Sequence, residues 1–348
     1  MKFDIKIKEI KKVKYHTKEY KLDKDITYDV PYSSKLVLEF EGKDINNIIC
    51  NTIRRVIFDN IPIYAIPNNF INITENKSVF NNDMMRNRLE QLPIYDVKSD
   101  LYYLEEKYWK NVDYDNREVH PKEKIIELYL DEKNDTNNIK NITTNDLQIF
   151  EESNKIDNKY SKKCPILLIQ LRPDETFKCS MKAILGVGEV NNIWGAGNCY
   201  YDDHTTDDMK GVFIENKTNR ITLTVESSGQ IPEYDLLDKA CSYIITKIKH
   251  ARDKFKEEIK PVIDNDIFVL MVDDEDHTLG QLINDVFQDH PDITFSGISK
   301  PDHFVKSIRF KIISKKKDLQ KIIDEQLAML SDKYEFIKSS IKKLKTKS

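Results

Sequence analysis

Hydrophobic and polar positions along the chain predict strand-like and helix-like stretches in a regular order. Residues 35–41 alternate between polar and apolar side chains, which is the period of a half-buried strand. Apolar residues then recur every three or four positions from Ile45 to Ile57, which predicts an amphipathic helix that Pro62 ends. We expect Asp44 to cap this helix, because a short acidic side chain accepts hydrogen bonds from the free amides of the first turn.

The same order of elements returns near the other end of the chain. Residues 267–272 form a short apolar run that predicts a strand, and residues 278–289 have the spacing of an amphipathic helix. An acidic turn lies between them, and Thr278 with Gln281 fits a capping box at the start of the helix. We interpret the two stretches as copies of one unit, related more by pattern than by identity.

A long helix with coiled-coil spacing follows each copy, and Pro232 opens the first of the two. Their apolar positions, three and four residues apart, are Leu237, Cys241, Ile244, Ile248, Ala251 and Phe255, and then Ile323, Leu327, Leu330, Tyr334, Ile337, Ile341 and Leu344. Such sustained spacing predicts a pairing seam. A solitary coiled coil is an alternative, but two such helices behind matching units favour packing within one pseudo-dimer.

The block between the first predicted helix and the rest of its unit predicts an inserted domain. Residues 82–91 have a helical pattern, and residues 123–131 and 165–171 read as strands. Residues 132–163 are rich in Asn, Asp, Lys and Thr, which predicts a loop or partly disordered segment. The fold class is therefore α+β.

Three domains follow from this organisation. The first unit comprises residues 1–61 and 173–260, the inserted domain covers 62–172, and the second unit covers 261–348. The connection between the two units is short, over about 260–265.

Composition and charge exclude several classes of protein. Hydrophobic residues make up 39% and charged residues 33% of the chain, which is typical of a globular protein rather than a disordered one. The net charge of −4 excludes a uniformly basic nucleic-acid coat. Residues 306–348 nevertheless carry 13 Lys and Arg against 5 Asp and Glu, which suits either nucleic acid or a solvated helix face. We expect no membrane helix and no signal peptide, hence an intracellular protein.

Candidate catalytic and metal-binding residues do not form a recognisable site. Residues 273–277 (Asp-Asp-Glu-Asp-His) resemble a metal site, but consecutive ligands do not match a calcium loop, and an acidic turn at a helix start is favoured. The five Cys residues lie at least 15 positions apart, without a CxxC pair. Nucleophile elbows and glycine-rich phosphate loops are absent from the sequence. We therefore expect no catalytic residue, no metal and no cofactor.

Arginines and one tryptophan are the candidates for binding a partner. Arg54 and Arg55 lie off the apolar strip of their helix, and arginine suits hydrogen-bonded contacts at interfaces. A surface salt bridge is an equally good interpretation, and the same two interpretations apply to Arg86 and Arg88. Trp194 lies in a glycine-rich turn, where a core anchor is the favoured alternative.

Five motifs resemble the two alpha-like assembly subunits of multisubunit DNA-dependent RNA polymerase. Four of them are similar to the larger alpha-like subunit, at residues 51–66, 75–94, 186–202 and 225–232. The fifth, residues 273–312, is similar to the small alpha-like subunit, with Glu-Asp-His-Thr-Leu-Gly at 275–280 as its signature. The motifs follow the family's order and spacing over most of residues 30–345, and a fused chain of this kind resembles those of large DNA viruses.

The resemblance implies a non-catalytic platform with the pseudo-dimeric alpha-like dimerisation fold, in which antiparallel sheets pack on long helices. A larger alpha-like dimerisation domain with its inserted domain is joined to a small alpha-like domain. The implied partners are the largest and second-largest polymerase subunits and the small zinc-bundle subunits, with DNA contacted only through the complex and no membrane or obligate homo-oligomer. It implies an intracellular location, in host cytoplasm or packaged in the virion. The implied partner-binding residues are Arg54, Arg55, Glu75, Asn76, Arg88 and Trp194. The implied seam comprises Leu237, Ile244, Ile248, Phe255, His277, Thr278, Leu279, Leu282, Leu327, Leu330 and Tyr334.

Two departures from the family pattern carry expectations of their own. Larger alpha-like subunits often hold zinc or an iron–sulfur centre in the inserted domain, but residues 97–120 contain no Cys, so we expect no metal. The second copy also lacks the pair formed by Arg54 and Arg55, so the two units should dock asymmetrically, the first on the second-largest subunit. Two alternative functions remain. The chain could be a transcription regulator that binds DNA through its basic C-terminal region, or an enzyme built on the acidic cluster at 273–277.

Overall fold

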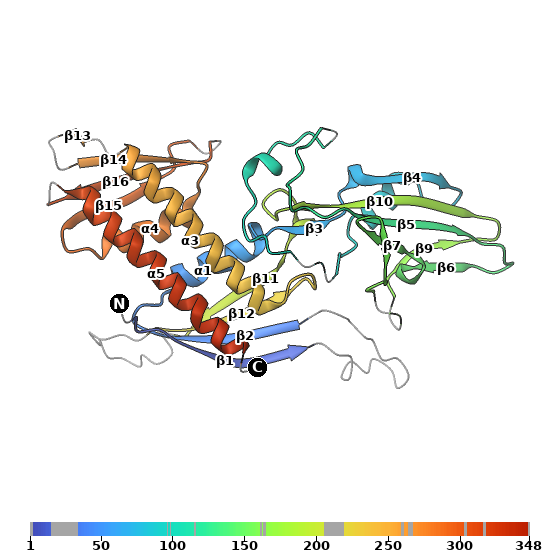
Figure 1. The fold of residues 1–348 in the computed structure, drawn as a ribbon, viewed down its shortest axis with the longest axis horizontal. Helices are drawn as coiled ribbons and strands as arrows, with labels where there is room; N and C mark the ends of the chain where they lie inside the picture. The colour runs from blue at the N-terminus through green and yellow to red at the C-terminus, as the bar shows by residue number, and fades with distance from the viewer. Residues whose placement is uncertain are drawn as a thin grey trace.

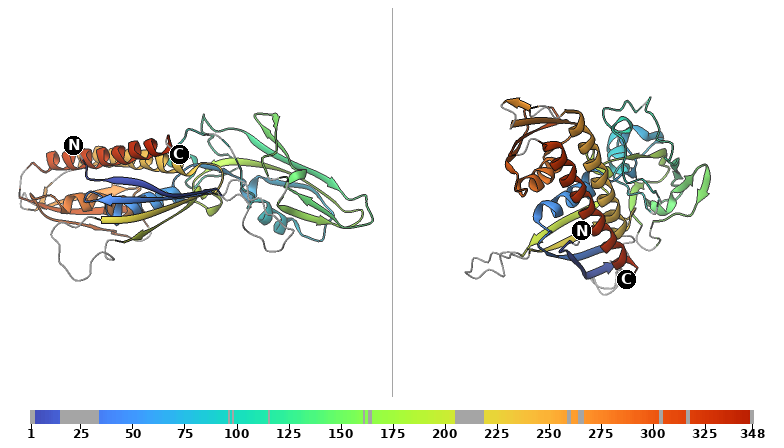
Figure 2. Two further views of the ribbon diagram at one scale, coloured as in Figure 1. Left: turned by 90° about the horizontal axis from the view of Figure 1, so that it is seen from below. Right: turned by 60° about the vertical axis from the view of Figure 1, so that its left-hand side comes forward.

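The computed structural model describes residues 3–14, 34–95, 97, 99–114, 116–160, 162, 165–204, 219–258, 261–263, 267–302, 305–315 and 318–346. The molecule is elongated, with the duplicated units at one end and the inserted block at the other (Figures 1 and 2). Cys164, His303 and, within the connection over 260–265, residues 260, 264 and 265 lie outside the described residues. Within the described ranges, no helix is both long and apolar enough to cross a bilayer.

The first unit is an antiparallel sheet with two helices packed on it. Its strands are β1 (Lys6–Lys14), β2 (Ser34–Gly42), β11 (Gly197–Asp203) and β12 (Asn219–Ser227), in the order β1-β2-β12-β11. Its helices are α1 (Asn47–Asp59) and α3 (Glu233–Glu258). Alternate residues of β2 are fully buried, as the polar–apolar pattern predicts.

The cap of α1 differs from the prediction. Asn46 is the N-cap, and its side chain accepts a hydrogen bond from the Ile49 amide at 3.0 Å. The Asp44 carboxylate instead accepts from the backbone amide of Asp4, which ties the start of the chain to this turn. Both side chains can cap a helix, and the position where the backbone becomes helical decides between them.

The second unit repeats this plan. Its strands are β13 (Pro261–Ile263), β14 (Ile267–Asp273), β15 (Ile293–Ser299) and β16 (Ser307–Ser314), in the order β13-β14-β16-β15, and its helices are α4 (His277–Gln288) and α5 (Leu319–Lys345). The predicted capping box is wrong. Asp276 is the N-cap of α4 and accepts from the Thr278 amide at 2.8 Å, because the helix begins earlier than its apolar pattern.

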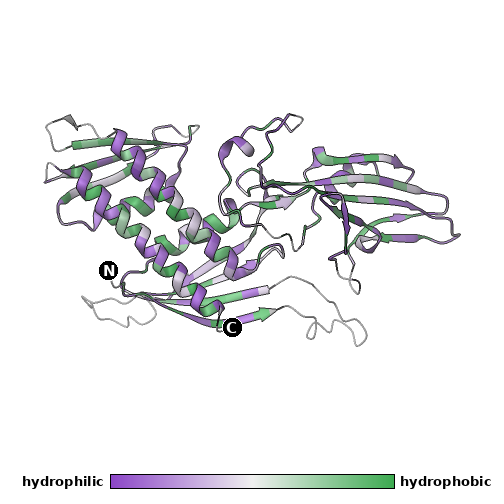
Figure 3. Ribbon diagram, viewed as in Figure 1, coloured by the Kyte–Doolittle hydropathy of each residue, from purple (hydrophilic) through white to green (hydrophobic). Residues whose placement is uncertain are grey.

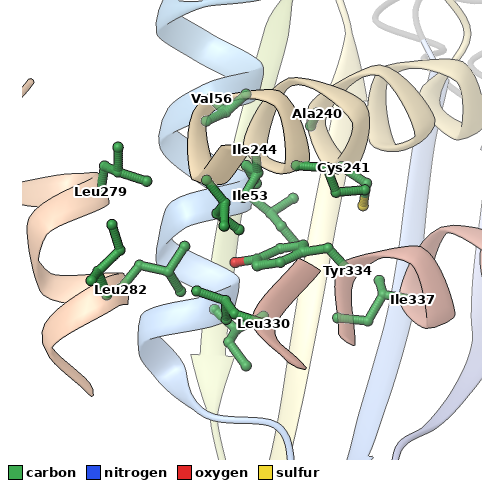
Figure 4. Packing of buried hydrophobic residues seen from close by; sticks show 14 of the residues in the cluster. Ile53, Val56, Ala240, Cys241, Ile244, Leu279, Leu282, Leu330, Tyr334 and Ile337 are labelled. Atoms are coloured by element: carbon green, nitrogen blue, oxygen red, sulfur yellow. The ribbon is translucent and has the colours of Figure 1, made fainter. Parts of the chain in front are cut away.

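The two units share one hydrophobic core. Helices α3 and α5 are antiparallel, because Lys342 of α5 pairs with Asp238 near the start of α3 while Arg252 near the end of α3 pairs with Asp324 near the start of α5. Between them and the sheets lie α1 and α4, and side chains from all four helices meet around Tyr334 (Figure 4). The buried seam residues are Leu237, Ile244, Ile248, Phe255, Leu279, Leu282, Leu327, Leu330 and Tyr334.

The inserted block has a second core of its own. A six-stranded sheet in the order β3-β10-β5-β7-β8, with β4 also on β10, stands beside the pair β6-β9. The elements are β3 (Ile63–Ala65), β4 (Ile71–Asn76), α2 (Asn82–Leu89), β5 (Ile126–Lys133), β6 (Lys140–Thr143), β7 (Gln148–Glu151), β8 (Asn154–Ile156), β9 (Leu167–Leu171) and β10 (Thr176–Gly186). Strand β10 comes after residue 172, the predicted end of the inserted domain, yet it pairs with β4 and β5 of that domain. The division into domains stays a prediction.

The prediction of a loop over 132–163 is wrong, because this segment contains β6, β7 and β8. The strands are three or four residues long and mostly polar. A few apolar side chains in this segment, Ile142, Leu147 and Ile149, reach the core of the insert. Composition averaged over the segment hides them.

Candidate functional site

The two units and the inserted block meet around a cleft of about 320 Å³. We call it the junction cleft. Its walls come from α1, from residues 103–109 of the insert, from α3, and from the turn before α4. The charged and aromatic lining residues are Arg55, Asp59, Tyr103, Glu106, Trp109, Glu189, Tyr243, Lys247, Glu275, Asp276 and Lys306.

The acidic turn before α4 pairs with cations from three different elements. The Asp274 carboxylate lies 2.7 Å from Lys110 of the insert, and Glu275 lies 2.6 Å from Lys247 of α3. Asp276 lies 3.3 Å from a guanidinium nitrogen of Arg55 on α1, while its other oxygen caps α4. Because each carboxylate faces its own cation, the turn joins the three parts of the chain and is not arranged around a metal ion. The described residues include no cluster of three or more His, Cys, Asp or Glu that could hold one.

Glu275 and Lys247 form the most buried of these pairs, with each side chain 13% exposed. Burial raises the pKa of the Glu275 carboxyl, and the neighbouring Lys247 ammonium acts in the opposite direction. Burial alone lowers the pKa of Lys247, but the charge and hydrogen bond of Glu275 outweigh it, so the pKa is raised. Lys247 is therefore held protonated by its partner.

His277 does not belong to the seam, and this part of the prediction is wrong. The side chain of His277 is exposed at the first position of α4, whereas Leu279 and Leu282 of the same helix are buried. Thr278 is only partly buried. The signature residues 275–280 therefore have separate roles, in which the first two make ion pairs and the later ones pack.

Arg54 and Arg55 both lie off the apolar strip of α1, as their spacing predicts. Arg54 donates from Nε to the Asn51 side chain at 3.0 Å. Arg55 is 38% exposed and bridges Asp59 of its own helix, at 3.5 Å, to Asp276 of the second unit. Arg55 therefore forms salt bridges within this chain. The exposed part of the Arg55 side chain lines the junction cleft.

Trp194 is a core residue. Its side chain is 2% exposed, and Nε1 donates to the backbone carbonyl of Ile184 at 3.1 Å. A Cβ on Gly186 would lie 2.5 Å from the indole, so only glycine lets the ring pack this closely. These contacts favour the core-anchor interpretation, because a side chain this buried offers little surface to a partner.

Around α2 the inserted block exposes apolar side chains, a surface that the sequence analysis did not predict. Val79, Phe80 and Met84 are 62%, 41% and 55% exposed. Phe80 and Met84 border a cleft of about 200 Å³, next to Arg88, which donates to the Leu167 carbonyl at 2.7 Å. In the sequence, the apolar residues Val79 and Phe80 within an otherwise polar turn could have indicated this exposed surface.

Glu75 and Asn76 lie at the end of β4, close to this turn. The Asn76 amide donates to the carbonyl of Phe80 at 2.8 Å and its oxygen accepts from Ser78, so Asn76 holds the turn in shape. Glu75 pairs with Lys77 at 2.9 Å. Both predicted partner-binding residues therefore already have contacts within the chain.

Residues 99–110 form a strap from the insert onto α3, which the sequence did not predict. The ammonium of Lys239 donates to the carbonyls of Ser99 and Leu101, each at 2.7 Å, and the ring of Tyr103 packs at an angle against the rings of Tyr243 and His250. Burial lowers the pKa of Lys239. In the resembled family a metal centre often occupies the inserted domain, but the corresponding stretch 97–120 offers no thiol ligand and instead makes these contacts.

Comparison with known proteins identifies the family. The profile of the RNA polymerase Rpb3/Rpb11 dimerisation domain matches residues 39–248, more than half of the chain. The chain belongs to this family. It is also 29% identical over 301 residues to a protein of Acanthamoeba polyphaga mimivirus that is named as a DNA-directed RNA polymerase subunit, with 79% of this chain and 80% of the relative covered.

Family membership confirms the alpha-like resemblance and the α+β dimerisation fold. This member of the Rpb3/Rpb11 family is an assembly subunit that associates with other RNA polymerase subunits. The family match ends inside α3 and does not reach residues 261–348. There the structure repeats the arrangement of the first unit, with an antiparallel sheet, a short helix and a long helix.

The alternative of a DNA-binding regulator is not favoured. Lys342 and Lys345, near the end of the basic C-terminal region, pair with Asp238 and Asp235 of α3. These charges serve the contact between the two long helices, so they are not all available to a nucleic acid. The acidic cluster proposed for an enzyme is similarly occupied by Lys110, Lys247 and Arg55.

Proposed function

We propose that this chain is a non-catalytic platform on which the two large catalytic subunits of a DNA-dependent RNA polymerase assemble. In this proposal residues 1–61 with 173–260 form the larger alpha-like domain, 62–172 its insert, and 261–348 the small alpha-like domain. The single core built from α1, α3, α4 and α5 carries the proposal, because it unites in one chain the two halves of a dimerisation fold.

The two ends of the platform offer different surfaces to the partners. The face of α1 with Arg54 and Arg55, beside the junction cleft, binds the second-largest subunit in this proposal, and the second unit binds the largest. The exposed apolar turn of the insert, bordered by Arg88, suits a further partner such as a small zinc-bundle subunit. DNA is contacted only through the assembled enzyme, and the polymerase acts in host cytoplasm or is packaged in the virion.

The experiment replaces Arg54 and Arg55 together by alanine and co-expresses the variant with both large subunits. Arg55 is only partly buried and its ion pairs are exposed, so their loss costs at most about 1 kcal/mol of stability. Loss of hydrogen-bonded arginines from a docked interface costs a few kcal/mol, on the order of a hundredfold in affinity. We therefore expect a folded variant that no longer recovers the second-largest subunit.

A matched control tests whether the position of Arg54 and Arg55 matters, and not only the loss of two positive charges. Arg172→Ala with Lys321→Ala also removes two positive charges, from exposed sites on the insert and on α5. This control should recover both large subunits. Recovery of the second-largest subunit at wild-type yield with the Arg54 and Arg55 variant, at moderate salt, contradicts the assigned docking face.

A further inference from the structure

Strand β14 is apolar on both faces. Phe268, Leu270 and Val272 are buried against the helices. The alternate residues, Ile267, Val269 and Met271, point to the opposite face and are partly exposed, and the strand is coloured as apolar along most of its length (Figure 3). An antiparallel sheet with one face in water normally alternates apolar and polar residues, whereas a strand covered on both sides is apolar throughout.

The strand register extends this second face across the sheet. Ile267 pairs with Ile313 of β16, which pairs with Phe295 of β15. Phe295 is 47% exposed, and a Cβ on Gly297 would lie 2.9 Å from its ring, so the ring covers the glycine on this face. A continuous apolar row therefore crosses β14, β16 and β15.

Two cations lie within this apolar surface. Val269 faces Lys311 and Met271 faces Arg309 in the next rows of the register. Both charged side chains are exposed, and neither makes an ion pair with any described residue. We call this surface, formed by Ile267, Val269, Met271, Phe295, Arg309, Lys311 and Ile313, the outer face of the C-terminal sheet.

The helices that contact this sheet lie on its other side. Phe255 of α3 and Phe287 of α4 pack on Phe310 of β16, which points away from the outer face. No described segment supplies the apolar cover that the composition of β14 calls for. Phe295, Arg309 and Lys311 stay exposed, so a segment from outside the described part of the chain can reach this face.

We infer that the outer face of the C-terminal sheet binds an apolar segment that carries carboxylates, supplied by another subunit of the polymerase. Burial of Arg309 and Lys311 among apolar side chains is unfavourable unless carboxylates pair with them, and interface cores exclude unpaired charge. Two cations are too few for a nucleic-acid surface, where each phosphate contact takes its own Lys or Arg. This inference rests on the proposed function and specifies the chemistry of one of its docking surfaces.

A second copy of this chain does not fit the same face. A twofold dimer brings the same patch of both copies together, and this patch contains Arg309 and Lys311 but no carboxylate, so the interface would gather the cations of both copies without a counter-charge. Like charges set opposite each other across an interface cost several kcal/mol. The chemistry of the face therefore selects a different chain with negative charge.

Photo-crosslinking in the co-expressed polymerase tests the inference directly. A benzophenone amino acid replaces Phe295, the complex is purified through a large subunit, and mass spectrometry identifies the cross-linked peptide. We expect one segment of another subunit, with carboxylates among apolar residues. The same probe at Lys321, 71% exposed on α5, is the control. Absence of cross-links at position 295 in a complete polymerase, cross-links to a second copy of this chain, or a segment without carboxylates overturns the inference.

Charge reversal supplies the second measurement. Arg309→Glu with Lys311→Glu should leave the melting temperature within about 1 °C, since both residues are exposed, and should weaken recovery of the cross-linked subunit at least tenfold. Lys249→Glu with Lys321→Glu, on exposed helix positions, should change neither. Unchanged recovery with the Arg309 and Lys311 variant overturns the inference. If the wild-type chain enters the polymerase and the Arg309 and Lys311 variant is recovered equally well, only the inference about the outer face is wrong and the platform proposal is unaffected. If the wild-type chain does not enter the polymerase, the platform proposal itself is wrong.

Discussion

Replacement of Leu330 by alanine tests whether the two units share a single core. Leu330 lies on α5, is 1% exposed, and packs in the cluster that also contains Ile53 of α1, Ile244 of α3 and Leu282 of α4 (Figure 4). The substitution removes buried carbon atoms and leaves a cavity, which costs about 2 to 5 kcal/mol in protein cores. Because four helices surround the site, the cavity cannot close by movement of one of them, and we expect about 4 to 5 kcal/mol, in the upper part of that range.

Tryptophan emission during urea unfolding is the assay. The chain has two tryptophans, Trp109 and Trp194, and both belong to the first unit and its insert. Leu330 belongs to the second unit. With one shared core, the loss of stability at Leu330 must move the unfolding midpoint that the tryptophans report. Leu344→Ala, the same change at a partly buried position of α5, is the control and should cost about 1 kcal/mol.

The result that refutes a shared core is a separation of signals. If circular dichroism shows that Leu330→Ala is destabilised while the tryptophan midpoint matches the wild type, the units unfold independently. Equal losses for Leu330→Ala and Leu344→Ala would also contradict the reasoning, because the estimate depends on full burial at the centre of the four helices.

Three further expectations concern charge, a buried hydroxyl and metal content. Glu275→Gln should destabilise the chain by about 3 to 5 kcal/mol in urea unfolding because Lys247 stays buried without its partner, and adding Lys247→Met should restore most of the loss; an additive double variant would rule out the pair. Tyr334→Phe should raise the unfolding free energy by about 1 kcal/mol, since the buried hydroxyl lies near Thr52 without a well-aligned hydrogen bond; a clear loss of stability would show that the contact with Thr52 is a stabilising hydrogen bond. Elemental analysis of the purified chain should find no stoichiometric zinc or iron, and one bound ion per chain would contradict the expectation that residues 97–120, which contain no Cys, bind no metal.

Local periodicity was enough to predict the duplicated units and their long helices. The apolar positions of α3 and α5 recur at three- and four-residue steps, and the seam residues at those positions are buried. A helix with such a stripe must bury it against another element, so the pattern predicts the pairing as well as the helix. The caps are less determined, because Asp44 and Asn46 can both cap a helix and the prediction chose the wrong one.

Polar segments with non-local pairing escaped the same reasoning. Strands β6, β7 and β8 occur where the composition predicted a loop, because each needs only one or two apolar residues once a neighbouring strand supplies the hydrogen bonds. The strap over 99–110 is held by Lys239 and by ring contacts with α3, which no local pattern encodes.

The sequence by itself determined the family, the duplication and most of the buried seam, since each depends on residues close together along the chain. Only the tertiary structure decided what the acidic turn does. Asp274, Glu275 and Asp276 find Lys110, Lys247 and Arg55, which are up to 221 positions away. Attraction between opposite charges depends on distance in space and on exclusion of water, and neither is written in the spacing of residues.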